Sequence, residues 1–372
     1  MVKKFVYGTP FETEAVVKEI PSSEGNPDYG TFSTENGFSF TTKLADEDMV
    51  FGLGEANRGI NKRGFLYISD CADDPNHVES KTSLYAAHNF IIISGKTHVG
   101  FFFDYPGTLR FDIGYTTSDT MTVSCENADL YVYMITGDSD LDIVKQFRGI
   151  IGRSYIAPKF AFGYGQSRWG YKTEDDFRTV VKKYRENHVP LDMVYMDIDY
   201  MQDYKDFTVN EERFPDFEGF VQDMKKEKIH LVPIIDAGVK VEKDYDIYEE
   251  GCEKGYFCRR EDGSYFEATV WPGWTHFPDV LNADARKWFG DKYDVLVSKG
   301  IDAFWNDMNE PSIFYSQEGL ADFKETAKKY VEGDPEVPHY MVGGKLQALA
   351  NNHEDYKRFY HNVNGEQIRH DK

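Results

Sequence analysis

The pattern of apolar and polar positions divides the chain into two parts. Up to about residue 150, short apolar segments alternate with Gly, Asp and Pro, a pattern typical of β-strands and turns. Two such segments, 31–34 and 38–42, flank Asn36-Gly37, a dipeptide that strongly indicates a hairpin. Further strands are predicted over residues 90–94, 99–103, 121–124 and 130–135. We therefore expect an antiparallel β-sandwich domain over residues 1–153, with a helix near 141–151.

From residue 154 to residue 372 strands and amphipathic helices alternate. After Thr173, which is suited to cap a helix with Asp176 three residues on, apolar side chains recur with helical spacing on one face. Later helices are expected to bury Phe217 and Phe220, and Trp288 after the cap residue Asn282. Strands are predicted over residues 160–166, 193–196, 229–235 and 301–305. Such alternation indicates a parallel sheet with right-handed crossovers, and the longest interval predicts an inserted excursion at about 240–274.

Composition narrows the class of protein. The chain has 42 basic and 64 acidic residues and therefore a formal charge of −22. This charge argues against binding to nucleic acid and against binding to an anionic membrane surface. No apolar run approaches the ~18–20 residues of a membrane span. The four cysteines form no CxxC pair, which argues against a disulfide scaffold or a zinc site. The N-terminal residues carry no apolar signal-peptide stretch, so we expect a soluble cytoplasmic protein with reduced thiols.

Candidate chemistry follows the predicted strands of the second part. The strand ends read Arg168-Trp169, Asp197-Ile198-Asp199, Asp236 and Asp307-Met308-Asn309-Glu310. Functional residues in parallel βα folds lie at the carboxyl ends of the strands. Acidic and indole side chains grouped around one binding site favour a neutral, polyhydroxylated ligand. Each Asp could instead cap the next helix. The Asp197-Ile198-Asp199 motif also occurs in metal-dependent glycosyltransferases; on a strand Asp197 and Asp199 would share a face. We expect no metal and no cofactor.

The segment Trp305-Asn306-Asp307-Met308-Asn309-Glu310-Pro311 resembles the nucleophile signature of glycoside hydrolase family 31, in the wording of its α-glucosidases. The resemblance continues through the chain from about residue 50. The matching segments are Phe51-Gly52-Leu53-Gly54-Glu55, residues 166–171, residues 191–201, Ile234-Ile235-Asp236 and Val270-Trp271-Pro272-Gly273. It implies an α/β fold in which the N-terminal antiparallel β-sandwich precedes a (β/α)8 TIM-type barrel, with only about four βα units present in this chain.

The resemblance implies a retaining, exo-acting α-glucosidase that removes terminal non-reducing glucose from α-gluco-oligosaccharides. Asp307 would be the nucleophile that forms a covalent glycosyl-enzyme, and Asp197 would hold hydroxyls of the bound glucose. The matching positions add the other substrate-binding candidates, which are Trp169, Ile198, Ile234, Trp271, Trp305 and Met308. An acid of the N-terminal domain, Asp73 or alternatively Asp70, would reach the mouth, whereas Glu310 is interpreted as a structural neighbour of the motif.

One departure from the family pattern concerns the general acid/base, which we expect beyond Lys372. Four strands cannot close an eight-stranded barrel, so we expect the remainder to come from a longer chain or a second segment. These residues alone are then expected to lack the proton donor for the leaving oxygen. Alternatives are a non-catalytic glucan-binding protein, an α-xylosidase or α-galactosidase, and a metal-dependent nucleotide-sugar transferase. The sequence does not decide which glycosidic linkage or which length of substrate is preferred, or whether the protein is a homo-oligomer.

Overall fold

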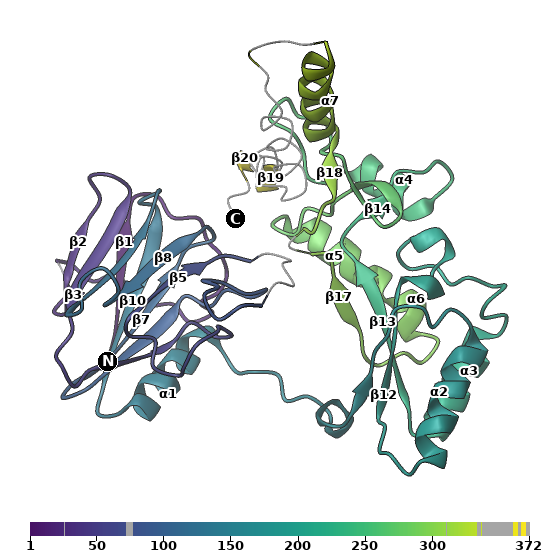
Figure 1. The fold of residues 1–372 in the computed structure, drawn as a ribbon, viewed down its shortest axis with the longest axis horizontal. Helices are drawn as coiled ribbons and strands as arrows, with labels where there is room; N and C mark the ends of the chain where they lie inside the picture. Colours follow the sequence, from purple (N-terminus) through teal and green to yellow (C-terminus); the bar gives the residue numbers. More distant parts are fainter. Residues whose placement is uncertain are drawn as a thin grey trace. The chain divides into compact units, whose positions relative to one another are not determined.

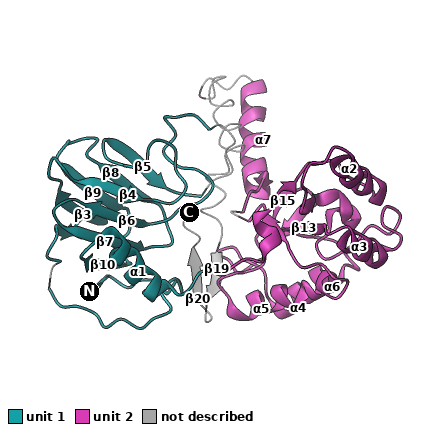
Figure 2. Cartoon of the chain, turned by 90° about the horizontal axis from the view of Figure 1, so that it is seen from below, with its two compact units in different colours: residues 1–155, 371–372 teal, residues 156–370 magenta. Residues whose placement is uncertain are grey.

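The structure, a computed structural model, describes residues 1–25, 27–71, 77–309 and 311–332, residue 336, and the strand residues 360–363 and 366–369. The chain forms two compact units, residues 1–155 and residues 156–370, which Figure 2 distinguishes by colour. No helix in the described part of the chain is both long enough and apolar enough to cross a membrane.

The first unit is a sandwich of two five-stranded antiparallel sheets (Figure 1). The sheets have the strand orders β1-β10-β7-β6-β4 and β2-β3-β9-β8-β5. The first contains β1 (Val2–Tyr7), β4 (Met49–Gly52), β6 (Phe90–Ser94), β7 (His98–Asp104) and β10 (Leu130–Gly137). The second contains β2 (Thr31–Ser33), β3 (Phe38–Lys43), β5 (Phe65–Ser69), β8 (Leu109–Ile113) and β9 (Thr120–Cys125). The predicted sandwich is therefore confirmed.

Alternating side chains of the strands fill the space between the two sheets. Phe40, Phe101 and Phe111 are completely buried there. The predicted hairpin joins β2 to β3, and its Gly37 has a φ of +80°. A Cβ atom at Gly37 would lie 2.4 Å from the carbonyl oxygen of Cys125, so this turn requires glycine.

Helix α1 (Asp140–Ile151) begins after Ser139, whose side chain accepts a hydrogen bond from the backbone of Asp142. It covers the outer face of the first sheet, where Phe147 stacks on Phe90 with ring centroids 3.8 Å apart. The helix predicted for residues 141–151 is thus confirmed, and it ends at Gly152, shortly before the second unit.

The second unit contains a four-stranded parallel sheet in the order β11-β12-β13-β17, with β12, β13 and β17 visible side by side in Figure 1. The strands are β11 (Gly165–Gln166), β12 (Met193–Met196), β13 (His230–Asp236) and β17 (Trp305–Asp307). The connecting helices are α2 (Glu174–Glu186), α3 (Phe217–Lys226), α5 (Ala283–Lys292) and α6 (Asp294–Val297). The apolar faces predicted from spacing contribute Phe177, Val181 and Phe220 to one buried cluster. The α/β class and the partial barrel are confirmed.

Two strand predictions were wrong in their extent. Residues 160–166 form the 3-10 turn Lys159–Phe162 and then the short β11, because the segment pairs with β12 through only two residues. Phe160 stacks on His230 instead of entering a strand. Residues 301–305 contain only the first residue of β17, because the backbone N–H of Ile301 bonds to Leu296 and closes the preceding turn.

A second, small antiparallel sheet is inserted after β13, in the order β14-β16-β15-β18. Its strands are β14 (Val239–Lys240), β15 (Ala268–Val270), β16 (Gly273–His276) and β18 (Tyr315–Ser316), and helix α4 (Asp246–Lys254) lies between β14 and β15 in the chain. Helix α7 (Gln317–Val331) follows β18 in the chain. The last described strands are β19 (Tyr360–Val363) and β20 (Glu366–Arg369), which pair with each other.

Candidate active site

The register of the parallel sheet brings several carboxyl groups to one edge. Asp236 and Asp307 are the last residues of β13 and β17, and they are paired in the register of these two neighbouring strands. Asp197 directly follows Met196, the last residue of β12. Because functional side chains of βα folds lie at the carboxyl ends of the strands, we take this edge as the candidate site.

Asp197 is the cap residue of the 3-10 turn Ile198–Tyr200, and its Oδ1 accepts a 2.8 Å hydrogen bond from the backbone of Ile198. Burial and the nearby charges of Asp307 and Asp199 raise the pKa of Asp197, against the lowering effect of the hydrogen bond. Asp197 and Asp199 do not lie on a strand and so do not share a strand face, because β12 ends at Met196. Asp199 is 1% exposed and lies 3.5 Å from a guanidinium nitrogen of Arg213.

Asp236 is 1% exposed, and neither of its carboxyl oxygens has a hydrogen-bond partner within the described residues. Burial, followed by the charges of Asp307 and Asp197, raises its pKa to about 8. Burial and the neighbouring acids thus favour the protonated, neutral form of Asp236.

Trp305, at the start of β17, pairs with Ile234 of β13. Its indole Nε1 donates a 3.3 Å hydrogen bond to the carbonyl oxygen of Met196, and its ring meets Tyr195 edge-on at 6.2 Å. The Tyr200 hydroxyl donates a 2.8 Å hydrogen bond to the carbonyl oxygen of Ile234. These bonds tie β12, β13 and the indole together, so the ring is held in one orientation beside the candidate nucleophile.

The inserted sheet and β17 supply the apolar candidates Trp271 and Met308. Trp271 lies in the turn between β15 and β16, is 47% exposed, and meets Phe314 edge-on with ring centroids 5.1 Å apart. Met308 follows Asp307 and is buried in a cluster with Val270. Its φ of +58° is unusual for a bulky side chain, and such strain is often found at functional sites.

The other predicted residues differ in their surroundings. Ile198 and Ile234 belong to the main buried cluster of the second unit, and Trp169, which follows β11, is 62% exposed. Asp73 and Glu310 lie outside the described residues. Asp70, the alternative to Asp73, directly follows β5 in the first unit, and its Oδ1 is buried.

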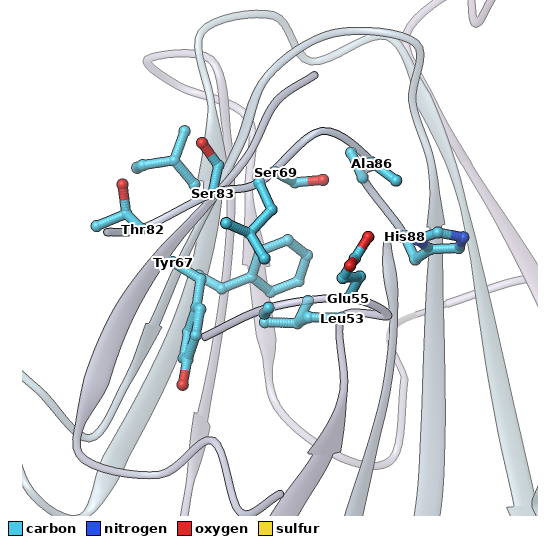
Figure 3. A pocket seen from close by; sticks show the side chains of 13 residues that line it. Leu53, Glu55, Tyr67, Ser69, Thr82, Ser83, Ala86 and His88 are labelled. Atoms are coloured by element: carbon cyan, nitrogen blue, oxygen red, sulfur yellow. The ribbon is translucent and has the colours of Figure 1, made fainter. Parts of the chain in front are cut away.

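Two further features bear on the chemistry. Within the described ranges, no group of three or more His, Cys, Asp or Glu side chains is arranged to hold a metal ion. A cavity of the first unit, lined by Leu53, Glu55 and Tyr67 among others, has Glu55 and His88 on one side and Thr82 and Ser83 on the other (Figure 3). Its volume of about 20 Å³ holds about one water molecule, which is too little for a sugar.

Two buried carboxyls, Asp206 and Asp236, are absent from the substrate-binding residues predicted from sequence. Asp236 was recognised only as a strand-end acid, whereas Asp206 carries no motif that would distinguish it from other loop acids. Asp206 is fully buried and accepts a 3.1 Å hydrogen bond from the backbone N–H of Asp236. The contact joins residues 30 positions apart, so only the folded chain shows it.

Solved structures that share this fold are glycoside hydrolases. A dextranase from Flavobacterium johnsoniae, crystallised with isomaltotriose, superposes with a TM-score of 0.71 at 22% identity over 89% of this chain and 41% of its own. The glucosidase II α subunit, crystallised with DNJ, superposes with a TM-score of 0.66 at 26% identity over 74% of this chain and 33% of its own. This chain therefore shares the fold of these structures, with a β-sandwich followed by parallel βα units.

The family is shown by the sequence itself. Residues 154–370 match the TIM-barrel domain of glycosyl hydrolases family 31, and residues 11–112 match the N-terminal galactose mutarotase-like domain of the same family. The chain belongs to glycoside hydrolase family 31, which confirms the resemblance seen in the motif of β17.

Several relatives of the chain are named α-glucosidases. Alpha-glucosidase 2 of Bacillus thermoamyloliquefaciens is 38% identical over 73% of this chain and 35% of its own length. The α-glucosidase of Saccharolobus solfataricus is 26% identical over 93% of this chain and 51% of its own length. The mouse lysosomal α-glucosidase is 31% identical over 76% of this chain and 30% of its own length. The chain thus spans about a third to a half of the length of these relatives.

Proposed function

We propose that the protein is a retaining, exo-acting α-glucosidase that hydrolyses terminal α-linked glucose with Asp307 as its nucleophile. The observation that carries the proposal is the place of Asp307 at the carboxyl end of β17, in register with Asp236 and beside the fixed indole of Trp305. Relatives named as α-glucosidases support glucose as the sugar.

In the proposed reaction the carboxylate of Asp307 attacks the anomeric carbon while the glycosidic bond breaks, giving a covalent glucosyl-enzyme. A carboxylic acid protonates the leaving oxygen, and as its conjugate base it then activates the water that releases glucose with retained configuration. In retaining enzymes these two carboxyls lie about 5–5.5 Å apart. We assign this acid to polypeptide outside these 372 residues, because the described sheet has four of the eight strands that close such a barrel.

Trapping of the intermediate tests this proposal directly. A fluorinated glucosyl fluoride reacts quickly with the nucleophile but hydrolyses slowly, because the fluorine destabilises the positive charge of both transition states. We expect the intact protein to gain one fluoroglucosyl group, and peptide mass mapping to place it on Asp307. A label on another residue, or release of β-glucose when the first product is followed by proton NMR, would rule out this mechanism.

Replacing Asp197 by Ala is expected to lower kcat/KM for an aryl α-glucoside about 10²- to 10⁴-fold. A carboxylate that accepts two sugar hydroxyls contributes roughly 1.5–3 kcal/mol for each charge-assisted hydrogen bond. Steady-state kinetics of the intact protein measure the effect. Asp192→Ala, a change just before the same strand, is the matched control and should alter kcat/KM less than about threefold, since it lies at the opposite end of β12. Equal effects of the two changes would argue against a sugar contact at Asp197.

A further inference from the structure

Asp206 lies directly behind the carboxyl end of β13. It is 0% exposed, and its Oδ1 accepts the backbone N–H of Asp236 at 3.1 Å. The hydroxyl of Tyr245 donates a 2.8 Å hydrogen bond to the carbonyl oxygen of Asp206. Its second carboxyl oxygen, Oδ2, is buried and has no hydrogen-bond partner within the described residues. Asp206 and Asp236 therefore form a buried carboxyl pair, joined through a main-chain hydrogen bond.

The loop that carries Asp206 has an uncommon backbone. Three residues of this loop have backbone φ values in the left-handed region, which residues other than Gly and Asn rarely adopt. They are Asp203 at +53°, Tyr204 at +58° and Phe207 at +61°. Edge-to-face contacts hold Phe207, with Phe289 at 5.0 Å and Tyr293 at 5.3 Å between ring centroids. Strained backbone of this kind persists only where packing fixes it. The packing thus places an acid at a buried position where a carboxyl group is costly.

The groups that face the pair are acids and phenols. Asp206 interacts electrostatically with Asp236 and with three tyrosines from neighbouring elements. These are Tyr200, Tyr245 and Tyr293. Asp236 in turn faces Asp307 and Asp197.

The basic side chains adjoining this loop have other partners. Lys205 pairs with Glu242 at 2.6 Å, and Arg213 pairs with Asp199 at 3.5 Å. Burial, and then the charge of Asp236, raises the pKa of Asp206 well above its usual range. The charges that raise the pKa values of Asp206 and Asp236 are those of other acids.

We propose that Asp206 and Asp236 are positioning residues whose buried carboxyl groups both keep a proton, so that neither adds an anion next to Asp307. The inference rests on the function proposed above and deepens it. A neutral pair fixes the end of β13 through the bond from Asp236 N–H to Asp206 without adding an anion next to Asp307. An ionised pair would repel the Asp307 carboxylate and raise its pKa, so that the nucleophile would be protonated in mild acid.

Infrared spectroscopy of the intact protein tests the proton directly. A protonated carboxyl has a C=O stretching band that is separate from the bands of a carboxylate. We expect the wild-type protein to show this band at about pH 6 and to lose it only as the pH rises past about 8, whereas an ordinary Asp is ionised throughout this range. The double variant Asp206→Asn with Asp236→Asn should lack the band. A wild-type protein without the band at about pH 6 overturns the proposal, whatever the variants do.

The pH profile of kcat/KM tests the consequence for the nucleophile. If the pair is already neutral, replacing Asp236 by the neutral, nearly isosteric Asn leaves the acid limb within about 0.3 pH unit of wild type. If Asp236 is an anion, its removal lets Asp307 ionise more easily, and the acid limb moves down by about one pH unit or more. A shift of that size contradicts the proposal.

Asp104→Asn is the matched control, because it changes a carboxyl that is also buried and has a raised pKa but belongs to the sandwich of the first unit. Its activity and acid limb should equal those of the wild type. The infrared result does not depend on which residue a fluorosugar labels. Loss of the label at Asp307 with the band retained therefore refutes the proposed function, whereas a missing band with Asp307 labelled refutes the pair alone.

Discussion

Replacing Asp307 by Ala is expected to lower kcat of the intact protein on α-glucosides by on the order of 10⁴-fold or more. The change removes the attacking oxygen, so no covalent glucosyl-enzyme can form. The structure supports this expectation because Asp307 ends β17 at the same edge as Asp197 and Asp236, where βα folds carry their functional side chains. Steady-state kinetics with maltose and with an aryl α-glucoside measure the loss.

A chemical rescue separates loss of the nucleophile from loss of the fold. The space left by the carboxylate admits azide, which attacks the anomeric carbon of an activated aryl glucoside as the phenolate leaves, and the product is β-glucosyl azide. Asp302→Ala is the matched control, since Asp302 pairs with His230 at the other end of the sheet, and it should change kcat less than about twofold. Wild-type-like hydrolysis by the Asp307 variant would mean that another group is the nucleophile.

Replacing Asp236 by Asn is expected to raise the free energy of unfolding at pH 8 by about 2–5 kcal/mol and to leave it nearly unchanged at pH 4. The folded protein raises the pKa of Asp236 from 3.8 to about 8, because the side chain is buried beside other acids. Between these values the folded state keeps a proton that the unfolded chain has released. The stability associated with this group is therefore complete below about pH 4 and is lost as the pH rises towards 8.

Denaturant or thermal unfolding of the intact protein at several pH values between about 4 and 8 measures this effect. The wild-type protein should lose stability relative to the Asn variant across that window. Asp302→Asn, which removes a partly exposed carboxyl near the other end of β13, is the control for the loss of a carboxyl group as such. A variant that is less stable than wild type at pH 8 would show that Asp236 is ionised and paired with a cation outside the described residues.

Short-range patterns in the sequence predicted much of the fold. The spacing of Phe177 and Val181 predicted the buried face of α2. Thr173 and Asp176 form the expected capping box at its start, with Asp in place of Glu. Asn36-Gly37 predicted the hairpin of β2 and β3. Each of these features depends on residues close together in the chain, so the local sequence is sufficient to specify it.

Predictions failed where an element depends on distant neighbours. Residues 160–166 were predicted to form a strand, but β11 contains only Gly165 and Gln166, which pair with β12. Asp197 lies at the end of β12, as predicted, but the 3-10 turn that it caps was not foreseen from the sequence. Periodicity indicates which residues prefer burial, but it does not indicate where pairing to another strand stops.

The amino-acid sequence by itself determined the family, the strand-end acids and the candidate nucleophile, because these are carried by contiguous motifs such as the segment around Asp307. Only the tertiary structure decided which acids are neighbours and in which direction burial moves their pKa values. The register of β13 and β17 places Asp236 beside Asp307, and a strained loop brings Asp206 behind them. The physical reason is that a pKa depends on burial and on charges that residues far apart in the chain bring together.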